Sequence, residues 1–540
     1  MKTSLLVIRS AIIAALGGLL FGFDTAVISG TVDSLKAVFQ LDDWWLGFTV
    51  ASALFGTILG AATAQLPSNH WGRKPTLIIW AVFYFVSAVG SAFPDCFGYL
   101  TTPYSWYSFL FFRFLGGIAV GGASVVSPLY TAEISPAKTR GILVAITQFN
   151  IVLGILAAFF SNFIIVGMNL GDMEWRWMFG VEAIPAAAFF FLLFFVPESP
   201  RWLIAQNRVN QARPILDALG TDSDNTETEI QIIQNAINEE SAQGKEIFFC
   251  RRFCFPIFLA ICMAAFNQLS GINAILYYAP KVFTIAGASK EWSMFFPVII
   301  GLTNLLFTVA AMFVIDWFGR RKLMLIGSLG YISSLCIVAG AFIIFGDEFN
   351  ISIKNVAATE AAEKVTKVQI MYDNAVSPDE KQFFTEELEK AKLVLNQANE
   401  ELQNEIWKDV PQGYLSLRGD TVPMAGILIV LGGLMLFIAS HAFGQGACIW
   451  VFIGEIFPNK VRAQGQALGS FVHWILAAII TQLFPPLLVL FGAATIFLLF
   501  AGMMFLQLLW VIFVMPETKQ IPLEEMQKIL GIVEREKNEQ

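Results

Sequence analysis

The octapeptide Glu133-Ile-Ser-Pro-Ala-Lys-Thr-Arg140 returns 322 residues later as Glu455-Ile-Phe-Pro-Asn-Lys-Val-Arg462. The tripeptide Pro197-Glu198-Ser199 returns in the same way, 319 residues later, as Pro516-Glu517-Thr518. Internal repeats of this kind indicate a duplicated architecture. We therefore expect two homologous halves joined by a linker.

A third repeat locates an insertion in the second half. Trp71-Gly72-Arg73-Lys74 returns as Phe318-Gly319-Arg320-Arg321 at an offset of only 247, so about 75 extra residues must follow. Segment 346–421 has that length, and from Ser377 onward apolar residues recur at heptad spacing up to Ile406. This pattern predicts a helical hairpin outside the membrane. The simplest interpretation is a solvated spacer, with partner binding as the alternative.

The segments between these motifs are strongly apolar. Of the 540 residues, 56% are hydrophobic and 14% are charged, whereas a soluble domain has roughly 25% charged residues, which argues against a soluble enzyme. A bilayer-spanning helix needs about 20 apolar residues. The first apolar stretch continues through Gly30 without a cleavage site, so we interpret it as a retained helix rather than a signal peptide. Twelve spans are predicted, at 8–31, 45–66, 76–94, 106–131, 141–166, 176–196, 253–286, 294–315, 323–345, 422–456, 463–490 and 492–515.

The predicted fold is an all-α membrane protein with twelve transmembrane helices in two pseudo-symmetric six-helix bundles, plus an extracytoplasmic helical insertion. Placing both termini in the cytoplasm leaves about 21 of the 34 Lys and Arg residues on the cytoplasmic side, as expected for a multi-pass inner-membrane protein. The predicted parts are a first bundle (1–196), a cytoplasmic helical linker (197–252), the first three helices of a second bundle (253–345), the insertion (346–421), the last three helices (422–515) and a cytoplasmic tail (516–540).

The net charge of −8 comes almost entirely from the insertion. Residues 347–420 contain 15 acidic and 8 basic side chains, which leaves the rest of the chain close to neutral. Nothing in this distribution suggests a nucleic-acid partner. Neither a nucleotide-binding loop nor a metal cluster is recognisable, so the sequence predicts no cofactor, no metal and no enzymatic activity.

The repeats form part of a larger set of motifs that resembles the sugar porters of the major facilitator superfamily. The resemblance is nearest to bacterial proton-linked xylose symporters, with facilitative glucose transporters more distant. It implies import of a monosaccharide, xylose or a hexose such as glucose, with a proton, by a monomer in the lipid bilayer whose halves alternate access to a midplane site. The other matching strings are Gly22-Phe23-Asp24-Thr25-Ala26-Val27-Ile28-Ser29-Gly30, Arg113-Phe114-Leu115-Gly116-Gly117, Gln268-Leu269-Ser270-Gly271-Ile272-Asn273 and Asp316-Trp317-Phe318-Gly319-Arg320-Arg321.

Three ionisable residues lie inside predicted spans of the first half: Asp24, Arg113 and Glu182. Such residues are expensive in a membrane and by default serve a function. We expect Asp24 to carry the coupled proton beside Arg113, because the resemblance implies an aspartate here in proton-coupled members. Glu182, which also matches a family acid, is assigned a secondary coupling role. The alternative is a structural ion pair in a passive uniporter.

The second half offers amide and indole groups instead of buried charge. Amides can donate to and accept from vicinal hydroxyls, and indole faces suit the C–H face of a sugar ring. The resemblance adds a histidine, an aromatic pair and a glycine at positions of the same cavity. The predicted substrate-binding residues are Gln148, Gln268, Asn273, Asn304, Trp450, Trp474, Asn267, His473, Phe21, Tyr278 and Gly446.

The repeated charged motifs predict a cytoplasmic latch. The resemblance implies that these groups pair when the carrier is closed to the cytoplasm, and a network of weak exposed pairs biases that equilibrium without locking it. A further alternative to transport is a sensor or adhesion protein that keeps the carrier fold and works through the insertion. The predicted latch residues are Arg73, Glu133, Arg140 and Glu198 in the first half and Arg320, Glu455, Arg462 and Glu517 in the second.

Overall fold

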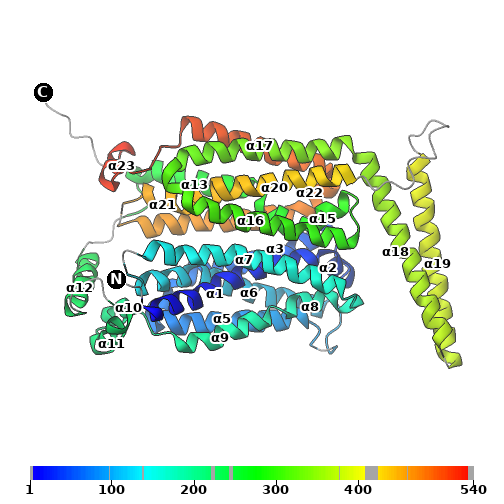
Figure 1. Cartoon of the computed structure of the whole chain (residues 1–540), viewed down its shortest axis with the longest axis horizontal. Coiled ribbons are helices and arrows are strands. Elements are labelled where there is room, and N and C mark those ends of the chain that lie inside the picture. Colours follow the sequence, from blue (N-terminus) through cyan, green and yellow to red (C-terminus); the bar gives the residue numbers. More distant parts are fainter. Residues whose placement is uncertain are drawn as a thin grey trace.

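The computed structural model describes residues 4–96, 98–136, 139–220, 226–242, 247–375, 377–407, 424–458 and 460–532. The predicted boundary at 421–422 and the last residues of the predicted tail lie outside these ranges. The helices form two side-by-side layers, one from each half of the chain (Figure 1). This all-helical arrangement matches the predicted fold class.

The first half contains long apolar helices that follow the predicted spans closely. The sixth predicted span is the exception, because it is divided into two helices at Val181 and Glu182. The helices of this half are α1 (Leu5–Val27), α2 (Val32–Val38), α3 (Asp43–Thr63), α4 (Gln65–Trp71), α5 (Arg73–Ala92), α6 (Tyr104–Ile134), α7 (Arg140–Gly167), α8 (Glu174–Gly180) and α9 (Ala183–Leu192).

The second half is more interrupted. Its seventh predicted span is three helices, and its tenth contains a π-helix, η5 (Ala442–Gly446). The helices of this half are α13 (Cys254–Leu269), α14 (Ile272–Tyr277), α15 (Ala279–Ile285), α16 (Lys290–Phe318), α17 (Arg320–Ile344), α20 (Met424–His441), α21 (Ala447–Ile456) and α22 (Arg462–Phe513).

Eleven helical segments of the described residues are long and apolar enough to cross a membrane, compared with the twelve spans predicted. The difference arises at α22, which runs for 52 residues across a kink at Gly492, where φ is 75° and ψ is 163°. A helix of that length would be about 78 Å long, more than twice the thickness of a bilayer core. The two predicted spans 463–490 and 492–515 meet at this kink.

The break between α13 and α14 has a clear cause. Gly271 adopts a left-handed conformation with φ of 82°, which ends α13 and lets the chain restart as α14. A Cβ atom at this position would lie 2.4 Å from the ring of Phe500, so the site also needs a residue without a side chain. Broken helices of this type are where transporters build binding sites.

The two ends of the bundle carry different appendages (Figure 1). We call one the linker end, because it holds the short helices α10 (Pro200–Ala205), α11 (Val209–Leu219), α12 (Thr226–Ala242) and α23 (Leu523–Ile529). The other is the hairpin end, which holds α18 (Gly346–Asn374) and α19 (Pro378–Trp407).

The helix start predicted at Ser377 is confirmed. The Ser377 hydroxyl accepts the Glu380 N–H at 3.1 Å, and the Glu380 carboxylate accepts the Ser377 N–H at 3.2 Å, which together form a capping box for α19. The base of α18 is anchored in the second half. Phe349 is buried there, and the Ser352 hydroxyl donates to the Gly287 carbonyl at 2.7 Å.

From this base α18 extends past the first half (Figure 1). Glu360, halfway along α18, lies within electrostatic reach of Lys290 of the second half and of Asp33 of the first. Two ion pairs join the halves beneath it: Lys281 with Asp33 at 2.7 Å, and Lys290 with Glu174 at 2.8 Å. The hairpin end is therefore the end at which the halves are held together.

The hydrophobic clusters also differ between the hairpin end and the linker end. One cluster is shared by the two halves and contains Phe23, Phe109, Phe283 and Trp474. Toward the linker end each half instead has a cluster of its own, one around Leu77 and Tyr130, the other around Leu323 and Phe452. The residue packing thus closes the bundle at the hairpin end and leaves the halves separately packed at the linker end.

Candidate functional site

A buried ion pair lies at the centre of the first half. Arg113 on α6 donates from Nη1 to Asp24 Oδ1 on α1 at 2.6 Å, and from Nη2 to the Asp24 carbonyl oxygen at 3.2 Å. Both side chains are about 2% exposed. The guanidinium also lies over the ring of Phe179, 5.3 Å from its centroid. The structure therefore brings the predicted acid and base together.

Glu182 is the third ionisable group of this centre. It lies where α8 ends and α9 begins, is buried, and is close enough to Asp24 for the two carboxyl groups to interact. Its Oε1 atom has no hydrogen-bond partner among the residues that the structure describes. A buried carboxyl oxygen without a partner is costly, so this position has an unused capacity to hold a proton or a hydrogen-bond donor.

The ion pair is in contact with the other half of the molecule. A narrow cavity is lined by Asp24, Thr25 and Arg113 from the first half and by Tyr277 and Trp474 from the second. Phe21, one turn before Asp24, packs on Trp474 with ring centroids 5.7 Å apart. A change at Asp24 can therefore affect groups of both halves.

A cluster of amides forms the adjoining part of the second half. Gln268 donates from Nε2 to Asn267 Oδ1 at 2.9 Å and accepts from Asn273 Nδ2 at 2.9 Å. The same Nε2 lies 3.2 Å from the His473 ring nitrogens. Four predicted substrate residues thus form one hydrogen-bonded group, and the break at Gly271 is what lets α13 and α14 contribute to it together.

The predicted aromatic residues surround His473. Its ring centroid is 4.8 Å from that of Trp474 and 5.4 Å from that of Trp450. Trp450 is 38% exposed although it lies in a membrane-crossing helix, so its indole is available to a ligand or to lipid. Gly446 ends the π-helix η5 just before α21, and π-helical turns are frequent at functional sites.

Three predicted substrate residues stand apart from this group. Gln148 on α7 is exposed. Asn304 is buried in α16 and accepts a weak hydrogen bond from Thr308 at 3.4 Å. Tyr278 is packed away from the amides, with its ring stacked on Phe484 and its hydroxyl donating to the Thr481 carbonyl at 3.2 Å.

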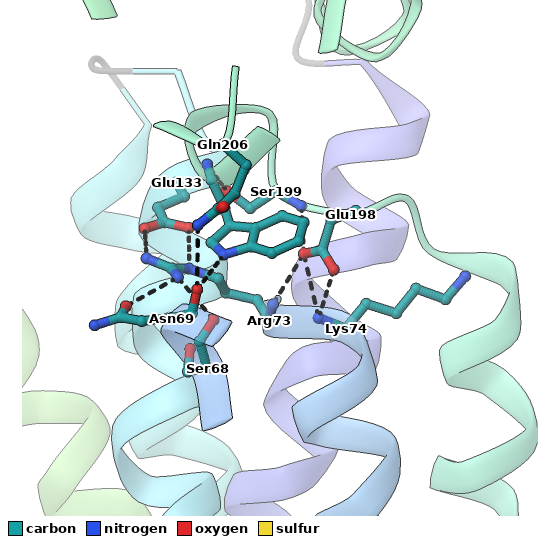
Figure 2. A network of polar contacts seen from close by, with 9 residues as sticks. Ser68, Asn69, Arg73, Lys74, Glu133, Glu198, Ser199 and Gln206 are labelled. Carbon is teal, nitrogen blue, oxygen red and sulfur yellow. Dashed lines mark hydrogen bonds and ion pairs between the residues drawn. The ribbon is translucent and has the colours of Figure 1, made fainter. Parts of the chain in front are cut away.

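Three of the four predicted latch residues of the first half, Arg73, Glu133 and Glu198, form a network at the linker end (Figure 2). The Arg73 guanidinium donates two parallel hydrogen bonds to Glu133, both 2.8 Å long. Glu198 accepts the backbone N–H groups of Arg73 at 3.0 Å and of Lys74 at 3.3 Å, so its carboxylate caps the N-terminus of α5. Burial raises the pKa of Glu198, and these N–H groups together with that of Ser199 oppose the rise.

The short helix α10 is tied into the same network. The Trp202 indole donates to the Asn69 carbonyl oxygen at 2.9 Å, and Gln206 donates to the same oxygen at 3.4 Å. Arg73 in turn donates to the Ser68 carbonyl oxygen at 3.0 Å (Figure 2). The linker is therefore fixed to the short helix α4, which precedes α5.

The second half repeats this geometry. Glu517 accepts the backbone N–H groups of Arg320 at 3.0 Å and Arg321 at 3.2 Å, and the Arg320 side chain pairs with Glu455 at 2.9 Å. In both halves a left-handed glycine precedes the capped helix, with φ of 105° at Gly72 and 86° at Gly319. A Cβ atom there would lie 2.4 Å from the Glu198 carboxylate and 2.7 Å from that of Glu517.

These pairs join residues of the same half. Arg140 donates to the Ser135 carbonyl oxygen at 3.4 Å, and the buried Nε and Nη2 atoms of the half-buried Arg462 have no hydrogen-bond partner in the described part of the chain. The sequence motifs identify charged groups at helix ends but not which group each one contacts. A latch that joins the two halves therefore remains a prediction.

Sequence reasoning missed three residues of this region. Tyr277 lines the cavity beside Asp24, and Tyr331 is fully buried with its hydroxyl 2.5 Å from His441 Nδ1. None of them belongs to a charged motif, and uncharged tyrosine and histidine residues in mainly apolar stretches are too common in membrane helices to stand out. Within the described ranges no group of three or more His, Cys, Asp or Glu side chains is placed to hold a metal ion.

Comparison with known proteins adds independent information. Residues 10–362 and 415–530 match the family model described as "Sugar (and other) transporter". The chain is 33% identical over 525 residues to a glucose transport protein of Synechocystis sp., with 95% of each chain covered. It is 32% identical over 546 residues to the D-xylose-proton symporter of Escherichia coli K12, with 96% of this chain and 94% of that one covered. The inward-open structure of the xylose transporter of E. coli has a TM-score of 0.72 at 30% identity, covering 97% of this chain and 99% of that one.

Proposed function

The chain belongs to the sugar (and other) transporter family, and on that premise we propose that it imports a monosaccharide together with a proton by alternating access between its two halves. Relatives named for glucose and for xylose transport make a pentose or hexose of this kind the expected substrate. The family match covers both halves and the first part of α18, while residues 363–414, which include the rest of the hairpin, fall outside it.

The observation that carries the proposal is the buried Asp24–Arg113 pair beside a cavity shared by both halves. A buried pair is strongly weakened when one partner loses its charge. Protonation of Asp24 would release Arg113 and change the contacts of α1 and α6 with Tyr277 and Trp474 of the other half. Glu182, whose Oε1 has no hydrogen-bond partner among the described residues, would take part as a secondary acid.

The sugar is proposed to bind at the amide cluster of Asn267, Gln268 and Asn273 with His473. Neutral donors and acceptors suit sugar hydroxyls, and Trp450 and Trp474 provide flat apolar faces for the ring. Phe21 and Gly446 adjoin this group. Gln148 and Asn304 would contribute from α7 and α16, which pack against each other across the two halves. Tyr278 would act indirectly, by holding α15 and α22 together.

In a membrane, α22 is proposed to cross twice, with its turn at Gly492, which gives twelve crossings by a monomer. The linker end, with both termini, would face the cytoplasm of the inner membrane, and the hairpin end would face outward. The closed hairpin end and the likeness to an inward-open relative support an inward-facing state. The eight latch residues would then form pairs across the halves only when the linker end closes.

The test is transport by Asp24→Asn in proteoliposomes. We expect this variant to lose sugar accumulation driven by a proton gradient but to keep sugar counterflow, because the neutral side chain cannot take up or release the proton. Asp172→Asn, which changes an exposed aspartate at the hairpin end, is the matched control and should transport as the wild type does.

Unchanged accumulation by Asp24→Asn would contradict proton coupling through this residue. A passive uniporter, the alternative, would show no uptake of protons when sugar is added to de-energised vesicles. The pH of the external medium separates these two outcomes directly.

A further inference from the structure

Tyr331 and His441 form a buried pair that the proposed function does not use. Tyr331 lies on α17 and is fully buried, and His441 is the last residue of α20, directly before the π-helix η5. The Tyr331 hydroxyl is 2.5 Å from His441 Nδ1, and the two ring centroids are 6.1 Å apart. Neither residue belongs to a motif, and Gln445, the one polar side chain of η5, donates from Nε2 to Gln507 rather than to this pair.

The pair lies beside the proposed sugar site. The ring of His441 covers Gly446: a Cβ atom at Gly446 would be 3.2 Å from His441 Cδ2 and 3.4 Å from its Nε2. His441 is also an electrostatic neighbour of His473, which contacts Gln268, Trp450 and Trp474. The imidazole of His441 therefore stands at the edge of the amide and indole cluster.

The hydrogen bonds determine which nitrogen of His441 carries a proton. A buried tyrosine hydroxyl needs an acceptor, and the one hydrogen bond that the Tyr331 hydroxyl makes within the described ranges is with His441 Nδ1. The Ser270 hydroxyl is its other polar neighbour, and it donates to the Asn267 carbonyl oxygen at 2.6 Å. If Nδ1 accepts, the neutral ring carries its hydrogen on Nε2, which then acts as a donor. This Nε2 has no hydrogen-bond partner among the described residues, and His441 is partly exposed.

His473 has the opposite hydrogen-bonding role and acts as an acceptor. The Nε2 amide group of Gln268 is a donor, so the His473 nitrogen that faces it accepts. The site thus presents one imidazole that accepts and a second with an unused N–H. A sugar hydroxyl, which both donates and accepts, is a suitable partner for such an N–H donor.

We propose that His441 contacts the sugar directly, donating its Nε2–H to one ring hydroxyl, and that Tyr331 is the positioning residue that fixes this tautomer and orientation. The inference deepens the proposed function and rests on it. His441 would then be a specificity-determining residue, because a sugar without that hydroxyl, or with it in the other configuration, leaves the donor unpaired.

The test measures binding of D-glucose, and of the derivatives that each lack one of its hydroxyls, to the purified full-length protein by tryptophan fluorescence. We expect His441→Phe to weaken binding of D-glucose roughly threefold to tenfold, the usual contribution of one hydrogen bond. One derivative should bind wild type and variant equally, because it lacks the hydroxyl that His441 contacts. The other derivatives should lose affinity as D-glucose does.

Two further variants separate contact from packing. His441→Gln retains an N–H donor and should restore much of the lost affinity and the same pattern across the derivatives. Residue 331 is buried and does not contact the sugar. Tyr331→Phe should nevertheless weaken binding of the same derivatives that His441→Phe affects, to a smaller extent. If His441→Phe is poorly folded, these two variants carry the test.

An equal loss of affinity for every derivative, or no loss for any of them, would overturn the inference. Failure of the wild type to bind D-glucose, D-xylose or their derivatives would instead overturn the proposed function. The two failures are therefore distinguishable in the same titration.

Discussion

The carboxylate of Glu198 accepts the backbone N–H of Arg73 at 3.0 Å, so a residue of the linker caps the first turn of α5. Arg73 extends its side chain the other way, to Glu133 on α6. Three segments far apart in the chain are thus joined at one helix terminus, and Glu517, Arg320 and Glu455 repeat the arrangement in the second half. Because each capped helix is held within its own half, we regard these networks as the parts that keep each half rigid while the linker end is open.

Glu198→Gln should show a pH-dependent difference in stability from the wild type. Burial raises the pKa of Glu198 in the folded protein, so its contribution is fully present below the ordinary glutamate pKa of about 4.3 and is lost as the pH rises through the raised value. Glutamine has no such dependence. Melting temperatures in detergent should therefore move in favour of the variant as the pH rises across this window.

The matched control for that experiment is Glu389→Gln, which removes an exposed carboxylate on α19. A constant difference between wild type and Glu198→Gln at all pH values would contradict the expected role of burial. So would a difference that moves in favour of the wild type.

Gly271→Ala should destabilise the protein by about 2 kcal/mol or more, since a non-glycine residue is strained at positive φ and its Cβ would collide with Phe500. Gly340→Ala is the matched control. Gly340 lies inside α17 with nothing within 4 Å of the added Cβ, so alanine should leave stability unchanged or raise it slightly. Thermal unfolding of both variants checks the pair, and equal melting temperatures would argue against the strain at Gly271.

Phe349→Ala should cost about 3–5 kcal/mol, the range measured for phenylalanine truncation in a core. Phe349 is 1% exposed and packs against Phe342 and Phe345 where α18 leaves the second half. Phe383, near the start of α19, is 59% exposed, and its truncation should change stability by less than about 0.5 kcal/mol. Similar losses in the two variants would mean that the base of the hairpin is not integrated into the core.

Replacing both Lys281 and Lys290 by methionine should increase the fraction of molecules in which the halves are separated at the hairpin end. Each lysine forms an ion pair between the halves, and exposed pairs contribute up to about 1 kcal/mol each, so the equilibrium should shift by at most roughly 30-fold. Spin labels on α2 and α16 would report the longer distance between these two helices in the open molecules. Lys390→Met, which removes a pair within α19, should leave the distance distribution unchanged.

Much of this arrangement could be predicted from residue patterns. The Glu133 and Glu455 repeats predict two halves, and the pairing of Asp24 with Arg113 is expected because a buried charge needs a partner. The capping box at Ser377 is a local signal and is found as expected. These features depend on neighbours in sequence or on residue types with few alternatives.

Other features depend on packing that no local pattern records. The sequence predicts one continuous span across Gly271 and another across Glu182, because the apolar runs on either side of each break are long enough to form a single helix. The Arg73 and Arg320 motifs identify charged groups but not their partners. His441 belongs to no charged motif, and its contact with Tyr331 exists only because α17 and α20 pack side by side.

The hairpin has a mechanical consequence that follows from its anchoring. Its base is held in the second half at Phe349 and Ser352, while α18, about 43 Å long, extends over the first half without a described anchor of comparable depth. Because α18 is long and fixed only at its base, a tilt of a few degrees between the halves would displace its far end by several ångströms relative to the first half. In the proposed orientation, a dye attached near the tip of the hairpin would therefore report the transport cycle from outside the bilayer, without any label in the carrier itself.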